Sequence, residues 1–211
     1  MVFGQKASVL KARGKITAER LTRALPLHYN MQRISSPAGG GREAARMIIL
    51  GLDPGFGTMG YGVIEKDARG NCRAVDYGVV KTPPSENFAV RLCMLEQGVN
   101  ALFDKFSPVE AAMEELFFSK NVTTGIAVAH ARGVILMTCC KRCGRIFEYK
   151  PNQIKQALTG YGRADKGQMQ RCVASHLRLP SVPRPDDAAD ALGVALCHAF
   201  TSRFSGLFGI K

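Results

Sequence analysis

The chain has 211 residues, 46% of them hydrophobic, which is enough for one ordinary domain with a sizeable core and a terminal extension. Its 29 Lys and Arg residues outnumber 17 Asp and Glu residues, and the net charge of +12 favours a polyanionic partner such as nucleic acid. No apolar run approaches the roughly 20 residues that a membrane-spanning helix needs, and the seven scattered cysteines argue against a disulfide framework, so we expect a soluble, cytoplasmic protein.

The first 46 residues differ in composition from the rest of the chain. They carry nine Lys and Arg against two Asp and Glu, and the breaker-rich stretch 35–41 precedes a second Met at position 47. We predict a basic, disordered N-terminal extension over 1–46, a folded domain over 47–202 and a short C-terminal tail over 203–211. Two alternatives stay open for the extension: a targeting segment, because it is rich in Arg and poor in acids, or an upstream start in a protein that begins at Met47.

Secondary structure is predicted from Met47 onward. Short apolar runs bounded by Gly and Pro predict strands over 47–53, 61–65 and 74–80, joined as an antiparallel meander. Apolar residues at helical spacing predict an amphipathic helix from 88 to 106, with Ser85 or Asn87 as its cap. The later elements are a strand over 111–117, a helix over 123–140, a strand over 146–149, and helices over 151–158, 165–179 and 186–200. This order predicts an α/β fold, with a mixed five-stranded sheet and helices on both faces.

Acidic residues interrupt apolar segments at three places. Asp53 ends the first strand and Glu114 lies within the fourth, while Asp187 and Asp190 share one face of the last helix. Each has an ordinary explanation by itself: turn amides for Asp53, an ion pair for Glu114, and the helix dipole for the Asp pair. Together they bring oxygen ligands from separate elements, which Mg²⁺ and Mn²⁺ prefer. We therefore predict a two-metal hydrolytic centre.

Three segments resemble the motifs of RuvC Holliday junction resolvases: ILGLDPG at 49–55, MEELF at 113–117 and DAADAL at 187–192. The resemblance covers essentially residues 47–200 and implies a ribonuclease H-like fold. It also implies a homodimer that resolves four-way junction DNA by paired nicking of like-polarity strands, in recombination and DNA repair in a bacterial cytoplasm. The catalytic metal ligands would be Asp53, Glu114, Asp187 and Asp190, with two Mg²⁺ ions per subunit that Mn²⁺ can replace. The branch-migration proteins RuvA and RuvB are the implied partners.

The same resemblance assigns residues that contact DNA. Phe117 matches an aromatic that stacks on an unpaired junction base, and Lys155 and Lys166 match basic positions near the scissile phosphate. Arg163 adds positive charge beside the loop at 160–162. Core packing stays open as an alternative for Phe117, and a solvated surface position stays open for the lysines.

Three other classes of protein share part of this sequence pattern. Actin-like ATPases and sugar kinases also begin with a strand, an Asp and a Gly turn, but they need a second domain for which this chain is too short. Another ribonuclease H-like nuclease would share both fold and acids, because a fold does not settle the substrate. A non-catalytic junction-binding protein would need no metal ligands, and acids facing DNA without a cation would weaken its binding to phosphate.

Overall fold

The structure is a computed structural model that describes residues 46–116 and 122–201, with side chains of 122–124 left aside. All of these residues belong to the second of two units into which the chain divides, Glu43–Lys211. The predictions made for residues 1–45, for Phe117 and for the tail at 203–211 therefore lie outside the described residues.

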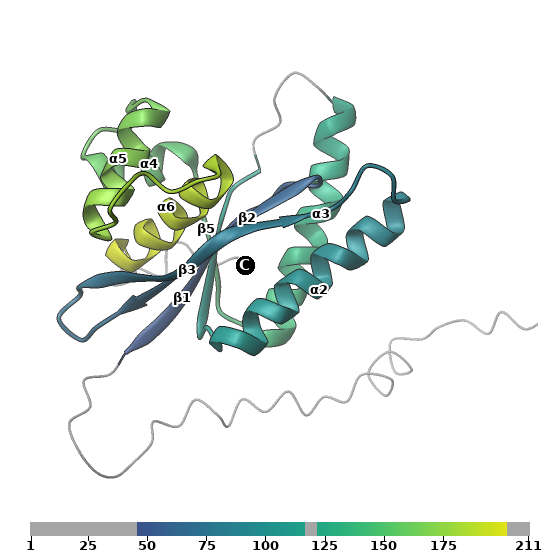
Figure 1. The fold of residues 1–211 in the computed structure, drawn as a ribbon, viewed down its shortest axis with the longest axis horizontal. Coiled ribbons are helices and arrows are strands. Elements are labelled where there is room, and N and C mark those ends of the chain that lie inside the picture. The colour runs from purple at the N-terminus through teal and green to yellow at the C-terminus, as the bar shows by residue number, and fades with distance from the viewer. Residues whose placement is uncertain (1–45, 117–121, 202–211) are drawn as a thin grey trace, which may run out of the picture. The chain divides into compact units, whose positions relative to one another are not determined.

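Five strands form one mixed sheet in the order β3-β2-β1-β4-β5 (Figure 1). Strands β1 (Met47–Asp53), β2 (Thr58–Lys66) and β3 (Cys72–Lys81) pair antiparallel, which confirms the predicted meander. Strands β4 (Glu110–Glu114) and β5 (Ile146–Tyr149) extend the sheet with parallel pairing on the other side of β1. Strand β4 ends three residues earlier than predicted, because β1 and β5, its two hydrogen-bonding neighbours, end at the same level.

Five helices are described: α2 (Phe88–Phe106), α3 (Val122–Arg142), α4 (Pro151–Thr159), α5 (Lys166–His176) and α6 (Asp186–Thr201). The Asn87 side chain caps α2 by accepting a hydrogen bond from the Val90 amide, and Asp165 caps α5 as its sequence position predicts. Helix α5 stops before the predicted residue 179, because Arg178 adopts a left-handed backbone conformation with φ of 52°. None of the described helices is long and apolar enough to cross a membrane.

The helices cover both faces of the sheet and create two hydrophobic cores (Figure 1). Helices α2 and α3 pack on one face around fully buried residues such as Leu50, Leu95 and Ile135. Helices α4, α5 and α6 cover the other face, where Ile49 and Leu192 are fully buried. The predicted arrangement of a mixed sheet between two helical layers is confirmed.

Helix α6 lies unusually close to the sheet because glycines face it from β1 and β2. A Cβ atom at Gly60 would lie 2.0 Å from the Asp187 carbonyl oxygen, and one at Gly51 would lie 2.2 Å from that of Ala191. Backbone therefore packs on backbone, which only glycine permits at these two strand positions. This contact brings the first turn of α6 to the carboxyl end of β1, where the first predicted acid stands.

Candidate active site

The four predicted acids converge at one end of the sheet. Asp53 and Glu114 are the last residues of the neighbouring parallel strands β1 and β4, just beyond the paired residues Leu52 and Met113. Since neighbouring parallel strands end at the same edge of a sheet, their two carboxylates lie close together.

Helix α6 supplies the other two acids. Asp53 pairs across β1 and β2 with Gly60, and Gly60 is the glycine against which the Asp187 backbone rests. Asp190 follows Asp187 by three residues, so both lie on the same side of the helix. The structure thus brings together acids that are as much as 137 residues apart in the sequence.

A cavity of about 270 Å³ opens beside these acids. Glu114 and Asp190 line it on the acidic side, and Lys155 of α4 and Lys166 of α5 line it on the basic side. The remaining lining comes from Pro151, Ile154 and Met169. Carboxylates and ammonium groups around one opening can hold cations and a phosphate group together.

Asp53, Glu114 and Asp190 have raised pKa values because they are partly withdrawn from water and lie near other acids. Burial raises the pKa of Asp53 from 3.8 to about 7, and the nearby charges of Glu114, Asp190 and Asp187 add to the rise. Burial likewise raises the pKa of Glu114, with a further contribution from Asp190. Burial also raises the pKa of Asp190, against the opposing effect of Lys166. A cluster of this kind favours protons or bound cations over bare negative charge.

Lys166 forms ion pairs with two acids at this site. Its Nζ lies 3.0 Å from Asp190 Oδ2 and 3.4 Å from Asp186 Oδ2. Although burial lowers the pKa of Lys166, the hydrogen bonds and charges of the two carboxylates raise it above its usual value overall. The sequence motif did not reveal Asp186 as a partner, and its only signal was a pair of consecutive acids where the helix begins.

Asp190 also shows whether these residues fit a hard metal ion. Its Oδ1 atom is buried and has no hydrogen-bond partner among the described residues, although its Oδ2 pairs with Lys166. An unsatisfied buried carboxylate oxygen amid other carboxylates suits a divalent cation that prefers oxygen ligands. Within the described residues, no three acidic, histidine or cysteine side chains are already grouped as a complete metal site.

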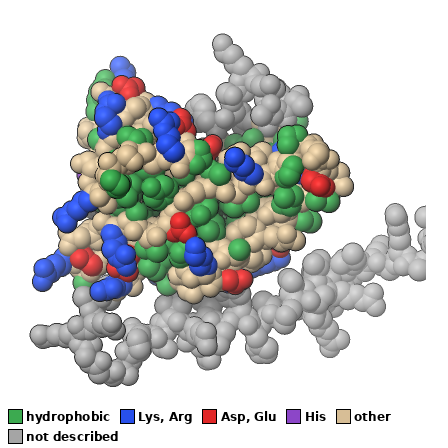
Figure 2. Space-filling view, viewed as in Figure 1, with side chains coloured by type: hydrophobic (Ala, Val, Ile, Leu, Met, Phe, Trp, Pro, Cys, Tyr) green, Lys and Arg blue, Asp and Glu red, His purple; other side chains and the backbone are tan. Residues whose placement is uncertain are grey.

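The predicted DNA-contacting residues differ in position. Lys155 and Lys166 lie at the cavity, whereas Arg163 is exposed in the turn between α4 and α5 and does not line the cavity. Phe117 lies outside the described residues. Figure 2 shows Lys and Arg side chains over the region of α4 and α5, the two helices that provide both lysines of the cavity.

A group of contacts between α2 and the loop after Asp53 was not predicted from the sequence. Arg91 of α2 donates a hydrogen bond to Thr82 Oγ1 over 3.0 Å, and Thr82 donates to the Phe56 carbonyl over 2.6 Å. The Arg91 guanidinium also lies 3.9 Å from the centre of the Phe56 ring, as in a cation–π contact. The loop that follows Asp53 is therefore held from the α2 side. Helical periodicity places Arg91 on α2 but says nothing about which loop it meets.

The strand order, the two helical layers and the acids on β1, β4 and α6 define a ribonuclease H-like protein with a carboxylate-lined active site. Comparison with known families agrees with this class. Residues 49–198 match the family model described as crossover junction endodeoxyribonuclease RuvC.

Related proteins and solved structures give the same assignment. Crossover junction endodeoxyribonuclease RuvC of Clostridioides difficile is 49% identical over 158 residues, covering 74% of this chain and 92% of the relative. The Chloroflexus aggregans protein of the same name is 49% identical over 165 residues, covering 78% of this chain and all of the relative. The structure of T. thermophilus RuvC in complex with a Holliday junction substrate superimposes with a TM-score of 0.71 at 35% identity, covering 77% of this chain and 98% of that one. The chain therefore belongs to the RuvC family, and the predicted ribonuclease H-like fold is confirmed.

A more distant solved structure supports the fold alone. The yeast mitochondrial Holliday junction resolvase superimposes with a TM-score of 0.59 at 14% identity, covering 76% of this chain and 81% of that one.

Proposed function

We propose that this chain is a structure-specific endonuclease that resolves Holliday junctions by metal-dependent, paired nicking of like-polarity strands during homologous recombination and DNA repair. The observation that carries the proposal is the convergence of Asp53, Glu114, Asp187 and Asp190 at one end of the sheet, beside a cavity with two lysines. Membership of the RuvC family supports it, and a structural neighbour has been solved with a Holliday junction substrate.

In this proposal, the four carboxylates hold two Mg²⁺ ions per subunit, with Mn²⁺ as a substitute. Ions held by these carboxylates would supply an activated water and positive charge at the departing 3′ oxygen. The chain contributes the oxygen ligands and excludes part of the bulk water, since Asp53, Glu114 and Asp190 are each partly buried. The two lysines of the cavity, Lys155 and Lys166, offset the charge of the phosphate that enters.

DNA contacts beyond the cavity complete the proposed binding surface. Arg163 stands exposed on the turn between α4 and α5, where its guanidinium is available to a DNA backbone. Phe117 follows the active-site Glu114 by three residues, which suits a ring that stacks on an unpaired base at the crossover. Replacing Phe117 by Ala should slow cleavage more than it weakens junction binding.

A homodimer would place two such sites on one junction, and α3 offers a surface for it. Five positions of α3 spaced three or four residues apart lie on one side of the helix and are exposed: Ile126, His130, Gly133, Met137 and Cys140. Ile126 is 52% exposed and Met137 is 44% exposed, which is high for large apolar residues within an otherwise packed helix. An apolar stripe suits a twofold interface, because the same patch faces itself across the axis. Figure 2 shows hydrophobic side chains open over the part of the molecule that α2 and α3 form.

The family supports a proposal for the cellular setting. The two relatives at 49% identity are bacterial proteins, so we propose that the chain works in the bacterial cytoplasm. The branch-migration proteins RuvA and RuvB are its proposed partners there. The basic extension over 1–46 and the tail over 203–211 stay predictions from composition.

A cleavage assay tests the proposed function directly. The full chain is incubated with a mobile four-way junction or with linear duplex of the same sequence, in Mg²⁺, Mn²⁺ or EDTA. We expect paired nicks in the junction alone, and only with metal. Cutting of both substrates would make the protein a general nuclease, and binding without cutting in any metal would make it a junction-binding protein.

A further inference from the structure

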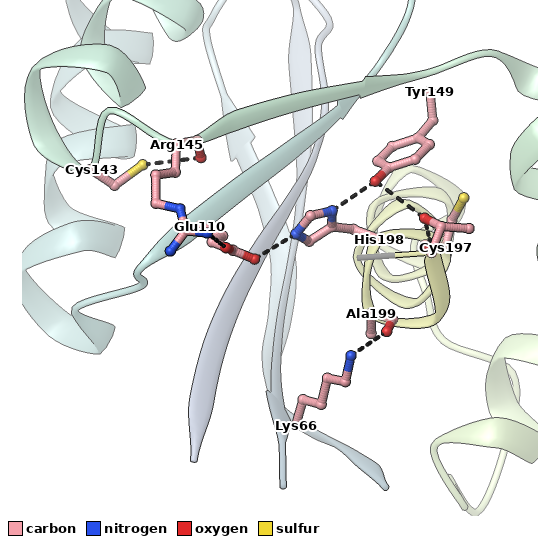
Figure 3. Close-up of polar contacts among 9 residues, drawn as sticks. Lys66, Glu110, Cys143, Arg145, Tyr149, Cys197, His198 and Ala199 are labelled. Carbon is pink, nitrogen blue, oxygen red and sulfur yellow. Dashed lines mark hydrogen bonds and ion pairs between the residues drawn. The ribbon is translucent and has the colours of Figure 1, made fainter. Parts of the chain in front are cut away.

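A row of buried, hydrogen-bonded side chains links β4, β5 and α6 at the end of α6 that is remote from the acids (Figure 3). His198 of α6 is fully buried, and Glu110 at the start of β4 is 4% exposed. The two ring nitrogens of His198 have different partners. Nε2 lies 2.7 Å from Glu110 Oε2, and Nδ1 lies 2.7 Å from the hydroxyl of Tyr149 on β5.

Both ends of this row of side chains have further hydrogen-bond partners. The second oxygen of Glu110, Oε1, lies 2.7 Å from a guanidinium nitrogen of Arg145, just before β5. At the other end, Thr201 Oγ1 lies within hydrogen-bonding distance of the Tyr149 hydroxyl, at 3.2 Å, and of the Cys197 carbonyl oxygen, at 2.7 Å. Figure 3 shows the Glu110, His198 and Tyr149 side chains pointing toward one another between the strands and the helix.

A row of buried polar side chains is not the simplest way to make a stable core. Withdrawing a carboxylate and an imidazole from water is costly, and well-packed apolar residues of similar size are often equally stabilising or better. Burial alone would raise the pKa of Glu110, but the hydrogen bond and charge of His198, together with Arg145 and Lys66, hold it below its usual value. Glu110 therefore stays a charged acceptor that fixes the direction in which His198 must point.

Apolar packing holds α6 on the sheet, with Leu192 and Leu196 fully buried, but much of this packing is nondirectional. Much of its buried side consists of small residues: Ala188, Ala189, Ala191, Ala195 and Ala199. Contacts between alanines and glycines are smooth and nondirectional, whereas a hydrogen bond weakens when its atoms move apart by a few tenths of an ångström. These hydrogen-bonded side chains thus tie α6 directionally to β4 and β5, beside the hydrogen bond that Lys66 of β2 donates to the Ala199 carbonyl.

We propose that Glu110, His198 and Tyr149 are positioning residues that set α6, and with it Asp187 and Asp190, relative to Glu114. The polar row is connected to the acids by a short segment of β4 and by a short segment of α6. Glu110 and Glu114 are the first and last residues of β4, and His198 follows Asp190 by eight residues, about 12 Å along a rigid helix.

Metal binding depends closely on the position of α6. Metal–ligand distances are held to within about 0.2 Å, so a small slide or rotation of α6 would change how its two acids meet the acid on β4. The inference rests on the proposed metal-dependent function. It adds a role for three residues that do not touch the metal or the DNA in that proposal.

The test compares Mn²⁺ binding by full-length variants without DNA, followed by electron paramagnetic resonance of the free ion, with cleavage rates as a second readout. Tyr149→Phe removes one hydroxyl and Glu110→Gln removes one charge, and both nearly keep the shape of the side chain. We expect each variant to weaken Mn²⁺ binding about threefold to tenfold, less than the 10- to 100-fold typical when a residue bonded directly to a metal ligand is lost. The Mg²⁺ concentration for half-maximal cleavage should rise by the same factor, while junction binding in EDTA is unchanged.

A control variant separates positioning from simple loss of stability. Val99→Ala removes apolar contact in the core on the opposite face of the sheet, and it should lower the Tm without changing Mn²⁺ affinity. Wild-type Mn²⁺ affinity in Tyr149→Phe and Glu110→Gln, with only their Tm lowered, would overturn the positioning role. A wild-type protein that binds Mn²⁺ but cuts no junction would instead refute the proposed function, and the affinity ratios of the variants would still decide the inference.

Discussion

Replacing Asp53 by Asn should stabilise the fold in the absence of metal and abolish metal-dependent cleavage. Burial, with the neighbouring acids, raises the pKa of Asp53 from 3.8 to about 7. Because the folded-state pKa lies above that of the unfolded chain, the folded state holds the proton more tightly. The associated stability is fully present below about pH 4 and is lost as the pH rises to about 7.

The size of this effect follows from the shift. A rise of about three pKa units at 1.36 kcal/mol per unit corresponds to an upper bound of about 4 kcal/mol lost above pH 7. Asn cannot ionise, so the variant should recover about 2–4 kcal/mol at pH 8. For a domain of this size, that gain corresponds to a rise in Tm of about 4–16 °C.

The assay is thermal unfolding of both proteins in EDTA between pH 5 and pH 8. We expect the two Tm values to diverge as the pH rises, with the Asn variant more stable at pH 8, and addition of Mn²⁺ should stabilise only the wild type. Asp104→Asn is a suitable control, because Asp104 is exposed on α2 and pairs with Arg142 at the surface. If the Tm of the wild type and of Asp53→Asn depended equally on pH, the pKa of Asp53 would not be raised in the folded state. Cleavage by Asp53→Asn at the wild-type rate would show that Asp53 is not a metal ligand.

Three further substitutions test the packing, the dimer and the basic side of the cavity. Gly60→Ala should destabilise the fold by about 1–3 kcal/mol or more and suppress cleavage, because its methyl would collide with the Asp187 carbonyl, whereas a methyl at Gly162 would lie 3.5 Å from the Asn152 carbonyl oxygen, an ordinary contact distance, so Gly162→Ala should not lower the Tm. Met137→Glu should convert a dimer to a monomer in sedimentation velocity and replace paired by single nicks, and a variant that stays dimeric would exclude this face of α3. Lys155→Ala should weaken junction binding in EDTA and reduce the slope of log affinity against log salt by about 0.9, so an unchanged slope would mean that Lys155 contacts no phosphate.

The local elements and the nature of the site could be predicted from the sequence. Strand β1 and strand β5 have the predicted bounds, and the Asn87 and Asp165 caps form as expected, because capping and alternation depend on neighbours in the chain. The four acids stood out because each interrupts an apolar segment, and their motifs suggested the family before any geometry was known.

Tertiary structure decided how those acids are arranged and what surrounds them. The close approach of α6 depends on glycines of two different strands, and the pairing of Lys166 with Asp186 joins two helices. The link from Glu110 to His198 spans 88 residues, and neither residue marks the other in the sequence. Sequence patterns report the period and composition of one segment at a time, whereas these contacts depend on where separate segments meet. The sequence by itself therefore determined the class of chemistry, and only the folded chain decided the distances and charges under which that chemistry can occur.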